Sequence, residues 1–248
     1  MYVAKNRLLL FLSLILLLLA ETASARPINF ESKYAGLSFN GGYTSNPNLS
    51  FLAPHSTADS TKTYVLGVAP FVRYQNMVFS PELSFYLPPT MHAGGIDTPT
   101  GNLYKERADS IIYTYGGNFT LIPHISKDMR FISFINFGAG LATFSSKNIR
   151  DYSSAAGAPL NSYTEHVKGS APYYLFSTGS NFFFLQNYSL GLESGYRFLK
   201  MSGLTYKSDY DRTNTFRGAG SKLNNLDGTP ATIGFSGFFF NVKLSLHF

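Results

Sequence analysis

Five charged residues lie in segments of the chain that are otherwise apolar or rich in glycine: Arg73, Glu82, Glu193, Arg197 and Lys243. Charged side chains in such surroundings must pair with one another, because transferring an isolated ion out of water costs free energy on the order of several kcal/mol. Carboxylates and cations held together can relay protons, bind an ion or fill an interior. The elements that carry these residues decide between these roles.

A second candidate for chemistry is the sequence His124-Ile125-Ser126, which sets a base two residues from a hydroxyl. This His-x-Ser pair resembles the motif of the lipid A deacylase barrels, which use His and Ser with a Glu. The longer motif of that family is not matched here, and Lys127 and Asp128 follow at once. Ser and Asp side chains often hydrogen-bond the backbone of a turn, so we interpret this segment as a turn and predict no catalytic residue.

Other chemistry is excluded by composition and spacing. The chain has no cysteine, so disulfides, thiolate metal sites and a thiolate nucleophile are ruled out. Its five histidines lie far apart, and no two have the spacing of metal ligands on a strand. No phosphate-binding loop, nucleophile elbow or metalloprotease helix is present. We expect no metal and no cofactor.

The end of the chain indicates the elements. From residue 238 onward every second residue is apolar: Phe238, Phe240, Val242, Leu244, Leu246 and Phe248. This alternation predicts a strand with one apolar and one polar face. A final strand that ends in Phe resembles the one that bacterial outer-membrane barrels present to their assembly machinery. The resemblance makes Leu244, Leu246 and Phe248 the expected assembly signal.

The alternation extends over the whole chain and predicts eight strands, at about 33–45, 62–75, 77–87, 109–122, 129–144, 171–184, 188–201 and 231–248. Tight turns at 75–76, 126–128 and 186–187 alternate with long polar connections at 45–62, 88–108, 145–170 and 202–230. This alternation is typical of an up-and-down transmembrane β-barrel with short periplasmic turns and long outer loops. An even strand count would place both termini of the mature chain in the periplasm.

The predicted register places the apolar residues of neighbouring strands on one face. A two-residue turn sets Tyr74 opposite Met77, and the strand near 171–184 is the one whose facing stays ambiguous. Aromatic residues near both ends of the strands suit the two interfacial girdles of a membrane barrel. The same register pairs Pro70 with Pro81, which both lack a ladder donor, so we expect a bulge or gap there.

The opposite face carries the five charged residues together with Ser, Asn and many Gly. Eight strands enclose a lumen just wide enough for side chains to fill. Glu193 and Lys243 lie on adjacent predicted strands at similar heights, so they are the first candidate ion pair. Arg73, Glu82 and Arg197 would complete a polar network. We favour polar filling over a proton or ion relay, and therefore predict a plugged lumen.

The first residues predict a secreted protein. Lys5 and Arg7 precede the apolar run 8–20, and Ala23-Ser24-Ala25 is a small-x-small cleavage site. We predict a cleaved signal peptide at 1–25 and a mature barrel domain at 26–248. The formal net charge of +6 has no Lys/Arg cluster of the kind that binds nucleic acid. The expected partners are outer-membrane lipid and lipopolysaccharide, with a surface ligand on the outer loops.

Two segments carry a resemblance to a known family. Phe79–Tyr86 (FSPELSFY) looks like the Pro-Glu strand of the PorT-like outer membrane protein β-barrel family, and Gly191–Phe198 (GLESGYRF) is similar to its late Gly-x-x-x-Gly-Tyr-Arg strand. The layout also resembles the OmpA/OmpX-like superfamily of small barrels. The resemblance implies location in the cell outer membrane, with a structural or surface-interaction role. A narrow conductance path and a lipid A-modifying enzyme are the alternatives.

Overall fold

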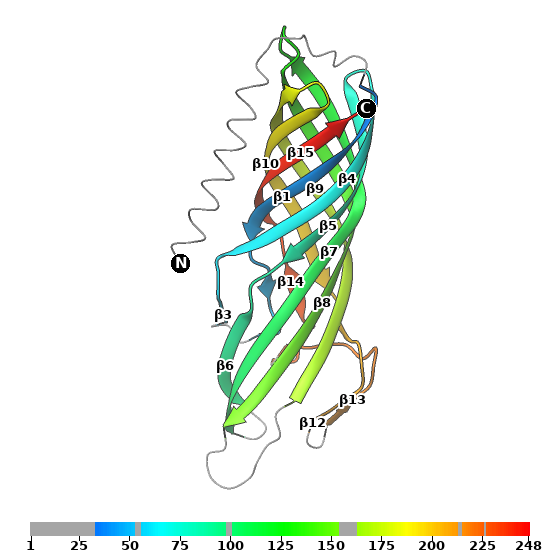
Figure 1. Ribbon diagram of the computed structural model, residues 1–248. Coiled ribbons are helices and arrows are strands. Elements are labelled where there is room, and N and C mark those ends of the chain that lie inside the picture. Colours follow the sequence, from blue (N-terminus) through cyan, green and yellow to red (C-terminus); the bar gives the residue numbers. More distant parts are fainter. Residues whose placement is uncertain (1–32, 53–55, 98–100, 154–162, 213–214, 226) are drawn as a thin grey trace, which may run out of the picture.

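A computed structural model describes residues 33–52, 56–97, 101–153, 163–212, 215–225 and 227–248. Eight long strands form a closed antiparallel barrel: β1 (Ala35–Ser45), β4 (Lys62–Tyr74), β5 (Met77–Leu87), β7 (Asn102–Ile125), β8 (Phe131–Ser153), β9 (Tyr163–Leu185), β10 (Tyr188–Ser202) and β15 (Gly237–His247). Each pairs with its neighbour in the chain, β9 pairs with β10, and β15 pairs with β1. The predicted eight-stranded up-and-down barrel is confirmed (Figure 1).

Three tight turns lie at one end of the barrel, together with the C-terminus (Figure 1). Tyr74↔Met77 closes the two-residue turn that the sequence predicted, and Gln75 adopts a positive φ of 53° there. At the same end, the backbone N–H of Tyr34 donates to the carbonyl of Phe248 at 3.1 Å. The two ends of the described barrel therefore meet beside the short turns, as an even number of strands requires.

The two prolines interrupt one ladder, as predicted. The pairing of β4 with β5 runs to Val68↔Leu83, stops, and resumes at Val72↔Phe79 in the same register. The interruption is therefore a gap and not a bulge. The hydroxyl of Ser80 donates to the carbonyl of Pro70 at 3.0 Å and satisfies an acceptor that the ladder leaves unpaired.

Large apolar side chains cover the outside of the barrel wall. Phe39, Leu66, Phe79, Phe137, Leu192 and Leu244 are each between 41% and 57% exposed, as the predicted faces require. The ambiguous strand is resolved: β9 turns Tyr174, Phe176 and Phe182 outward, and Tyr173, Ser177 and Phe183 inward. An exposed apolar surface of this extent marks a wall that water does not solvate well.

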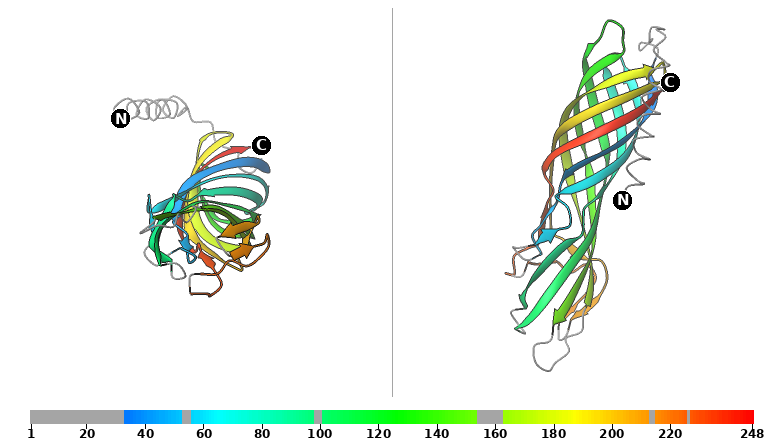
Figure 2. Two further views of the ribbon diagram at one scale, coloured as in Figure 1. Left: turned by 90° about the horizontal axis from the view of Figure 1, so that it is seen from below. Right: turned by 60° about the vertical axis from the view of Figure 1, so that its left-hand side comes forward.

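Three strands are longer than predicted, which corrects the ranges 109–122, 129–144 and 171–184. β7, β8 and β9 continue past the apolar wall, and β6 (Met91–Asp97) pairs with β7 beside them (Figure 2). Along this extension the outward positions hold charged residues such as Lys105 and Arg107, while Tyr104 and Ala108 point inward. The prediction failed here because it relied on an apolar outer face, which this part of the wall lacks.

The outer connections are not simply polar loops, which corrects a second expectation. Short strands β2 (Asn48–Leu49), β3 (Thr57–Ala58), β11 (Thr205–Tyr206) and β14 (Thr232–Gly234) join the sheet, and β12 (Tyr210–Arg212) pairs with β13 (Thr215–Arg217). The predicted strand 231–248 is present but interrupted at 235–236, because β14 and β15 (Gly237–His247) both pair with β10 in one register. These connections help to build the main hydrophobic core, which includes Leu49, Phe51, Met201, Leu204, Ile233 and Phe235.

The predicted signal peptide at 1–25 lies outside the described residues. Within the described residues, no helix has the length and apolar character needed to cross a membrane.

Candidate functional site: the barrel lumen

The lumen is filled in layers, beginning at the end that carries the tight turns. The His247 ring lies between Phe71, at 5.2 Å between ring centroids, and Phe183, at 4.5 Å. Nε2 of His247 hydrogen-bonds the hydroxyl of Ser189 at 2.8 Å. Ile122 and Ile132 pack with Phe183 in a small apolar cluster at the same level. Rings and aliphatic side chains therefore narrow this end of the lumen.

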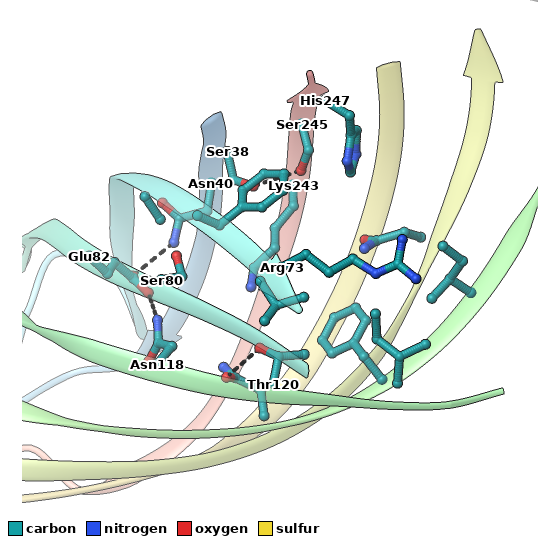
Figure 3. Close-up of a pocket in the computed structure, with 18 residues that line it drawn as sticks. Ser38, Asn40, Arg73, Ser80, Glu82, Asn118, Thr120, Lys243, Ser245 and His247 are labelled. Atoms are coloured by element: carbon teal, nitrogen blue, oxygen red, sulfur yellow. Dashed lines mark hydrogen bonds between the residues drawn. The ribbon is translucent and has the colours of Figure 1, made fainter. Parts of the chain in front are cut away.

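A polar chamber of about 80 Å³ follows, and Figure 3 shows the residues that line it. It is lined by side chains from all eight barrel strands except β10, among them Ser38, Asn40, Glu82, Asn118, Asn136, Asn181, Lys243 and Ser245. The volume is small enough to hold only a few water molecules. Such a chamber can hydrate or position ions, but it offers little room for an organic ligand.

Glu193 and Lys243 form an ion pair, with Nζ 2.8 Å from Oε2. The other carboxylate oxygen, Oε1, accepts hydrogen bonds from Asn136 at 3.1 Å and from Ser177 at 2.5 Å. Lys243 Nζ also lies 5.5 Å from the centre of the Phe134 ring. Glu193 is only 3% exposed, so this carboxylate has exchanged its water shell for three fixed donors.

Glu82 lines the same chamber, and within the described residues no cation lies at ion-pair distance from it. Its Oε1 accepts from Asn40 Nδ2 at 3.0 Å and from Ser84 Oγ at 2.5 Å, and its Oε2 accepts from Asn118 Nδ2. Figure 3 shows both amides turned toward this carboxylate. Neutral donors from three different strands thus stabilise the charge.

The structure does not bring all five predicted residues into one contiguous network. Arg73 lies toward the tight turns, where Nε donates to the carbonyl of Gln75 at 2.6 Å. Arg197 lies on the opposite side of the chamber, and its Nε donates to the carbonyl of Phe235 at 3.0 Å. Glu82 lies between these two levels. Position along the strand, which fixes height in the barrel, separates the cations.

Arg197 is held by aromatic rings, and it is only 1% exposed. Its guanidinium carbon lies 3.8 Å from the centre of the Phe235 ring and 4.5 Å from that of Tyr86. Nη2 donates to Thr44 at 3.3 Å. Within the described residues no carboxylate lies at ion-pair distance from Arg197. Cation–π contacts and a backbone carbonyl therefore stabilise this charge.

Four Asn–Gly pairs across neighbouring strands shape the chamber, and the sequence analysis did not find them. They are Asn40↔Gly67, Asn118↔Gly138, Asn181↔Gly191 and Asn241↔Gly42. In each pair the amide oxygen fills the space that a glycine side chain would need, and this oxygen has no conventional hydrogen-bond partner. The arrangement suits weak Cα–H···O contacts. Only the register reveals which Asn faces which Gly.

The outer core closes the lumen beyond Arg197. The rings of Tyr86 and Phe235 meet edge to face at 5.4 Å between centroids. β14 pairs with β10 and with β2, so the residues just before β15 and just after β1 lie side by side at the outer end. Ile233, Phe235 and Met201 are fully buried there. Buried side chains thus lie at several levels of the lumen, from His247 beside the tight turns to Phe235 at the outer end.

A further buried ion pair lies in the outer extension. Arg150 Nη2 is 2.6 Å from Glu106 Oε2, and the guanidinium lies 4.4 Å from the centre of the Tyr104 ring. Burial by itself would lower the pKa of Arg150, but the adjacent Glu106 carboxylate raises that pKa above its ordinary value. The pair holds the inner face of β7 to that of β8.

His124 and Ser126 lie at a tight turn, as interpreted from the sequence. The Ser126 hydroxyl donates to Asp128 and accepts from the backbone N–H of Phe131 at 2.9 Å. Hydrogen bonds from the Ser126 hydroxyl and from the Arg130 backbone lower the pKa of Asp128 below its ordinary value. Among the described contacts none joins His124 to Ser126. The hydroxyl thus has a structural role in the turn.

No family model matches the chain, and no curated relative matches it. The described residues also contain no group of three or more His, Cys, Asp or Glu side chains that could hold a metal ion.

Solved structures show a weak likeness. The attachment invasion locus protein Ail of Yersinia pestis is 11% identical, with a TM-score of 0.40 over 87% of this chain and 99% of Ail. Neisserial surface protein A is 10% identical, with a TM-score of 0.37 over 87% of this chain and 97% of that protein. The outer membrane protein OprG of Pseudomonas aeruginosa is 12% identical, with a TM-score of 0.38 over 87% of this chain and 97% of OprG. At these scores the fold assignment rests on the closed strand pairing itself.

Proposed function

We propose that this protein is a bacterial outer-membrane β-barrel with a plugged lumen, whose outer end serves a structural or surface-interaction role. The proposal rests on one observation: the closed wall has an apolar outer face and a polar inner face. The outside is covered by exposed apolar side chains, while the inside holds the buried polar residues Asn118, Glu193 and Arg197. This is the reverse of a soluble barrel, and lipid is the solvent that suits such a wall.

Closure of the ring supports the membrane assignment on separate grounds. Every one of the eight strands has a partner on both sides, because β15 pairs with β1 along nine residues and β9 pairs with β10. A sheet in lipid must have no open edge, since an unsatisfied backbone group there costs several kcal/mol, on the order given for apolar media. The tight turns and both ends of the mature chain would then be periplasmic.

A structural or surface-interaction role is favoured over transport by the filled interior. The layers around His247, Glu193, Arg197 and Phe235 leave a chamber of about 80 Å³ between them. The PorT-like resemblance of Phe79–Tyr86 and Gly191–Phe198 is consistent with this assignment. The outer extension, with its own buried Glu106–Arg150 pair, provides a rigid platform on which a surface ligand could be bound.

Cell fractionation tests the location. The full-length protein should appear in the outer-membrane fraction, and its apparent mass on a gel should change when the sample is heated, because a closed barrel resists detergent until it is boiled. The same gel should show no such change for a variant that lacks β15. Recovery of the mature chain in the soluble periplasmic fraction would overturn the proposal.

Assembly through the last strand is part of the proposal. Leu244 and Phe248 point outward and are 46% and 63% exposed, and the backbone N–H of Phe248 donates to the carbonyl of Ala35 at 2.8 Å. Deleting Phe248 should lower the amount of heat-modifiable protein in the outer membrane several-fold. Refolding of the purified variant into detergent should be unchanged, since the wall stays closed. Normal assembly of the variant in cells would remove this residue from the assembly signal.

A further inference from the structure

Three lysines stand on the outer face of one side of the barrel, just beyond its apolar surface. Lys147 on β8, Lys168 on β9 and Lys200 on β10 are all exposed. Their positions share the outward face with Phe137, Tyr174 and Phe198, by the two-residue period of each strand. None of the three forms an ion pair with another described residue. They are cations without a protein partner.

The strand register places these lysines next to the apolar part of the outer wall. Lys168 lies opposite Ser145, and Ser145 lies opposite Ile111, an apolar residue on the outer face of β7. One step beyond, Lys147 lies opposite His166. Lys147 and Lys168 are therefore diagonal neighbours, at about 7–8 Å for such a pair. Lys200 follows two residues after Phe198, which is 56% exposed.

The acidic residues nearby do not neutralise this cluster. Asp109 lies opposite Lys147, but its carboxylate bonds Arg107 at 2.8 Å and the hydroxyl of Thr90 at 2.7 Å. Glu106 is turned to the interior of the extension, where it pairs with Arg150. Asp151 stays exposed, farther out along β8. The outer face at this level keeps an excess of positive charge.

We propose that Lys147, Lys168 and Lys200 bind phosphate groups of lipopolysaccharide, whose acyl chains cover the apolar wall below. The inference rests on the proposed outer-membrane location. An amphipathic anion fits both surfaces at once: lysine ammonium groups bind phosphate, and the neighbouring Phe198 and Tyr174 contact hydrocarbon. Free phosphate would find only the ammonium groups, in water, where such pairs are weak. Because the three lysines lie on β8, β9 and β10, the bound lipopolysaccharide should contact that side of the barrel.

The test uses the full mature protein, refolded in zwitterionic detergent and titrated with purified lipopolysaccharide. Binding is measured as the rise in the temperature at which the heat-modifiable form is lost. The triple variant K147S/K168S/K200S should need roughly tenfold more lipopolysaccharide for the same rise, since each basic residue near an anionic surface strengthens binding several-fold. A matched control, K33S/K62S/K127S, removes the same charge from lysines at the tight-turn end and on β4, away from the cluster on β8, β9 and β10, and should bind as wild type.

Two ligand arms identify the chemistry. Enzymatically dephosphorylated lipopolysaccharide should stabilise the wild type and the triple variant equally. Phosphatidylglycerol and inorganic phosphate should stabilise the wild type less than intact lipopolysaccharide does. Equal binding by wild type and triple variant, equal loss in the control variant, or undiminished binding after dephosphorylation would each overturn the inference.

Failure of the proposed function looks different from failure of this inference. If the protein is absent from the outer membrane and shows no heat-modifiable form, the proposed function fails and the lysine cluster has no lipid to bind. If both variants reach the outer membrane in wild-type amounts but bind lipopolysaccharide equally well, the function stands and the lysine cluster is rejected.

Discussion

At the scale of single residues, the lumen stabilises each buried charge in its own way. Glu193 uses a contact ion pair with Lys243, Glu82 uses amide and hydroxyl donors, and Arg197 uses aromatic rings with a carbonyl. Arg73 also lines the chamber, so these five charges sum to +1. Among the described residues of the lumen, Glu193 and Lys243 balance their charges by direct contact.

Removing one partner of the Glu193–Lys243 ion pair should show how much the pair contributes to the stability of the folded barrel. Lys243→Met leaves Glu193 buried and uncompensated, and should destabilise the folded barrel by about 3–5 kcal/mol, the usual cost of removing one partner. The double variant K243M/E193Q should recover most of this loss, because no unpaired charge remains. Urea unfolding of both variants in lipid vesicles measures the difference. Equal stability of wild type and K243M would show that water reaches Glu193.

At the scale of elements, glycine placement decides which bulky side chains fit inside the wall. Gly116 on β7 and Gly140 on β8 lie opposite one another, and the Tyr173 side chain lies over both of them. A Cβ at Gly116 would lie 2.7 Å from the Tyr173 hydroxyl. The next residue, Gly117, faces outward, where a Cβ would meet only the flexible Phe79 ring at 3.3 Å.

These neighbouring glycines offer a matched pair of variants. Gly116→Ala should lower the free energy of unfolding by about 1–3 kcal/mol, the range for overpacking, because its Cβ also meets the Ala139 carbonyl of the adjacent strand. Gly117→Ala should change stability by less than about 1 kcal/mol. Heat-modifiability at graded temperatures compares the two. A larger loss of stability for Gly117→Ala than for Gly116→Ala would mean that the wall accommodates an added methyl group more easily on its inner face than on its outer face.

At the scale of the whole molecule, the barrel combines two regions that distribute apolar and charged residues in opposite ways. The short-turn half has an apolar outer wall around a polar interior, whereas the outer end has charged residues outside and an apolar core inside. Strands β7, β8 and β9 run through both regions without a break (Figure 2). The outer core thus lies at the mouth of the same barrel whose other half carries the apolar outer wall.

The plugged lumen that we propose predicts that the barrel conducts no current. The purified barrel should give no conductance steps in a planar bilayer at moderate voltage, because His247, Arg197 and Phe235 occupy successive levels of the lumen. Protease protection of the inserted protein serves as proof of insertion, and a porin added to the same bilayer serves as the positive control. Reproducible steps from the wild type would support the alternative of a narrow transport path.

The sequence by itself determined the barrel. Alternation fixes which residues face outward, and tight turns such as Tyr74↔Met77 fix the register, since a slip of one residue would turn every side chain to the wrong face. That was enough to place Glu193 beside Lys243 and to anticipate the gap at Pro70 and Pro81. Local pattern carries this information because each strand pairs with its neighbour in the chain.

Only the tertiary structure decided what fills the barrel beyond Arg197. Leu49 follows β1 and Phe235 lies between β14 and β15, so residues far apart in the sequence meet in this core. The Asn–Gly pairs likewise exist only across strands. Above the apolar wall the outward positions hold charged residues such as Lys105, and apolar side chains such as Tyr104 face inward. The apolar outer face that marks the strands below is therefore absent there.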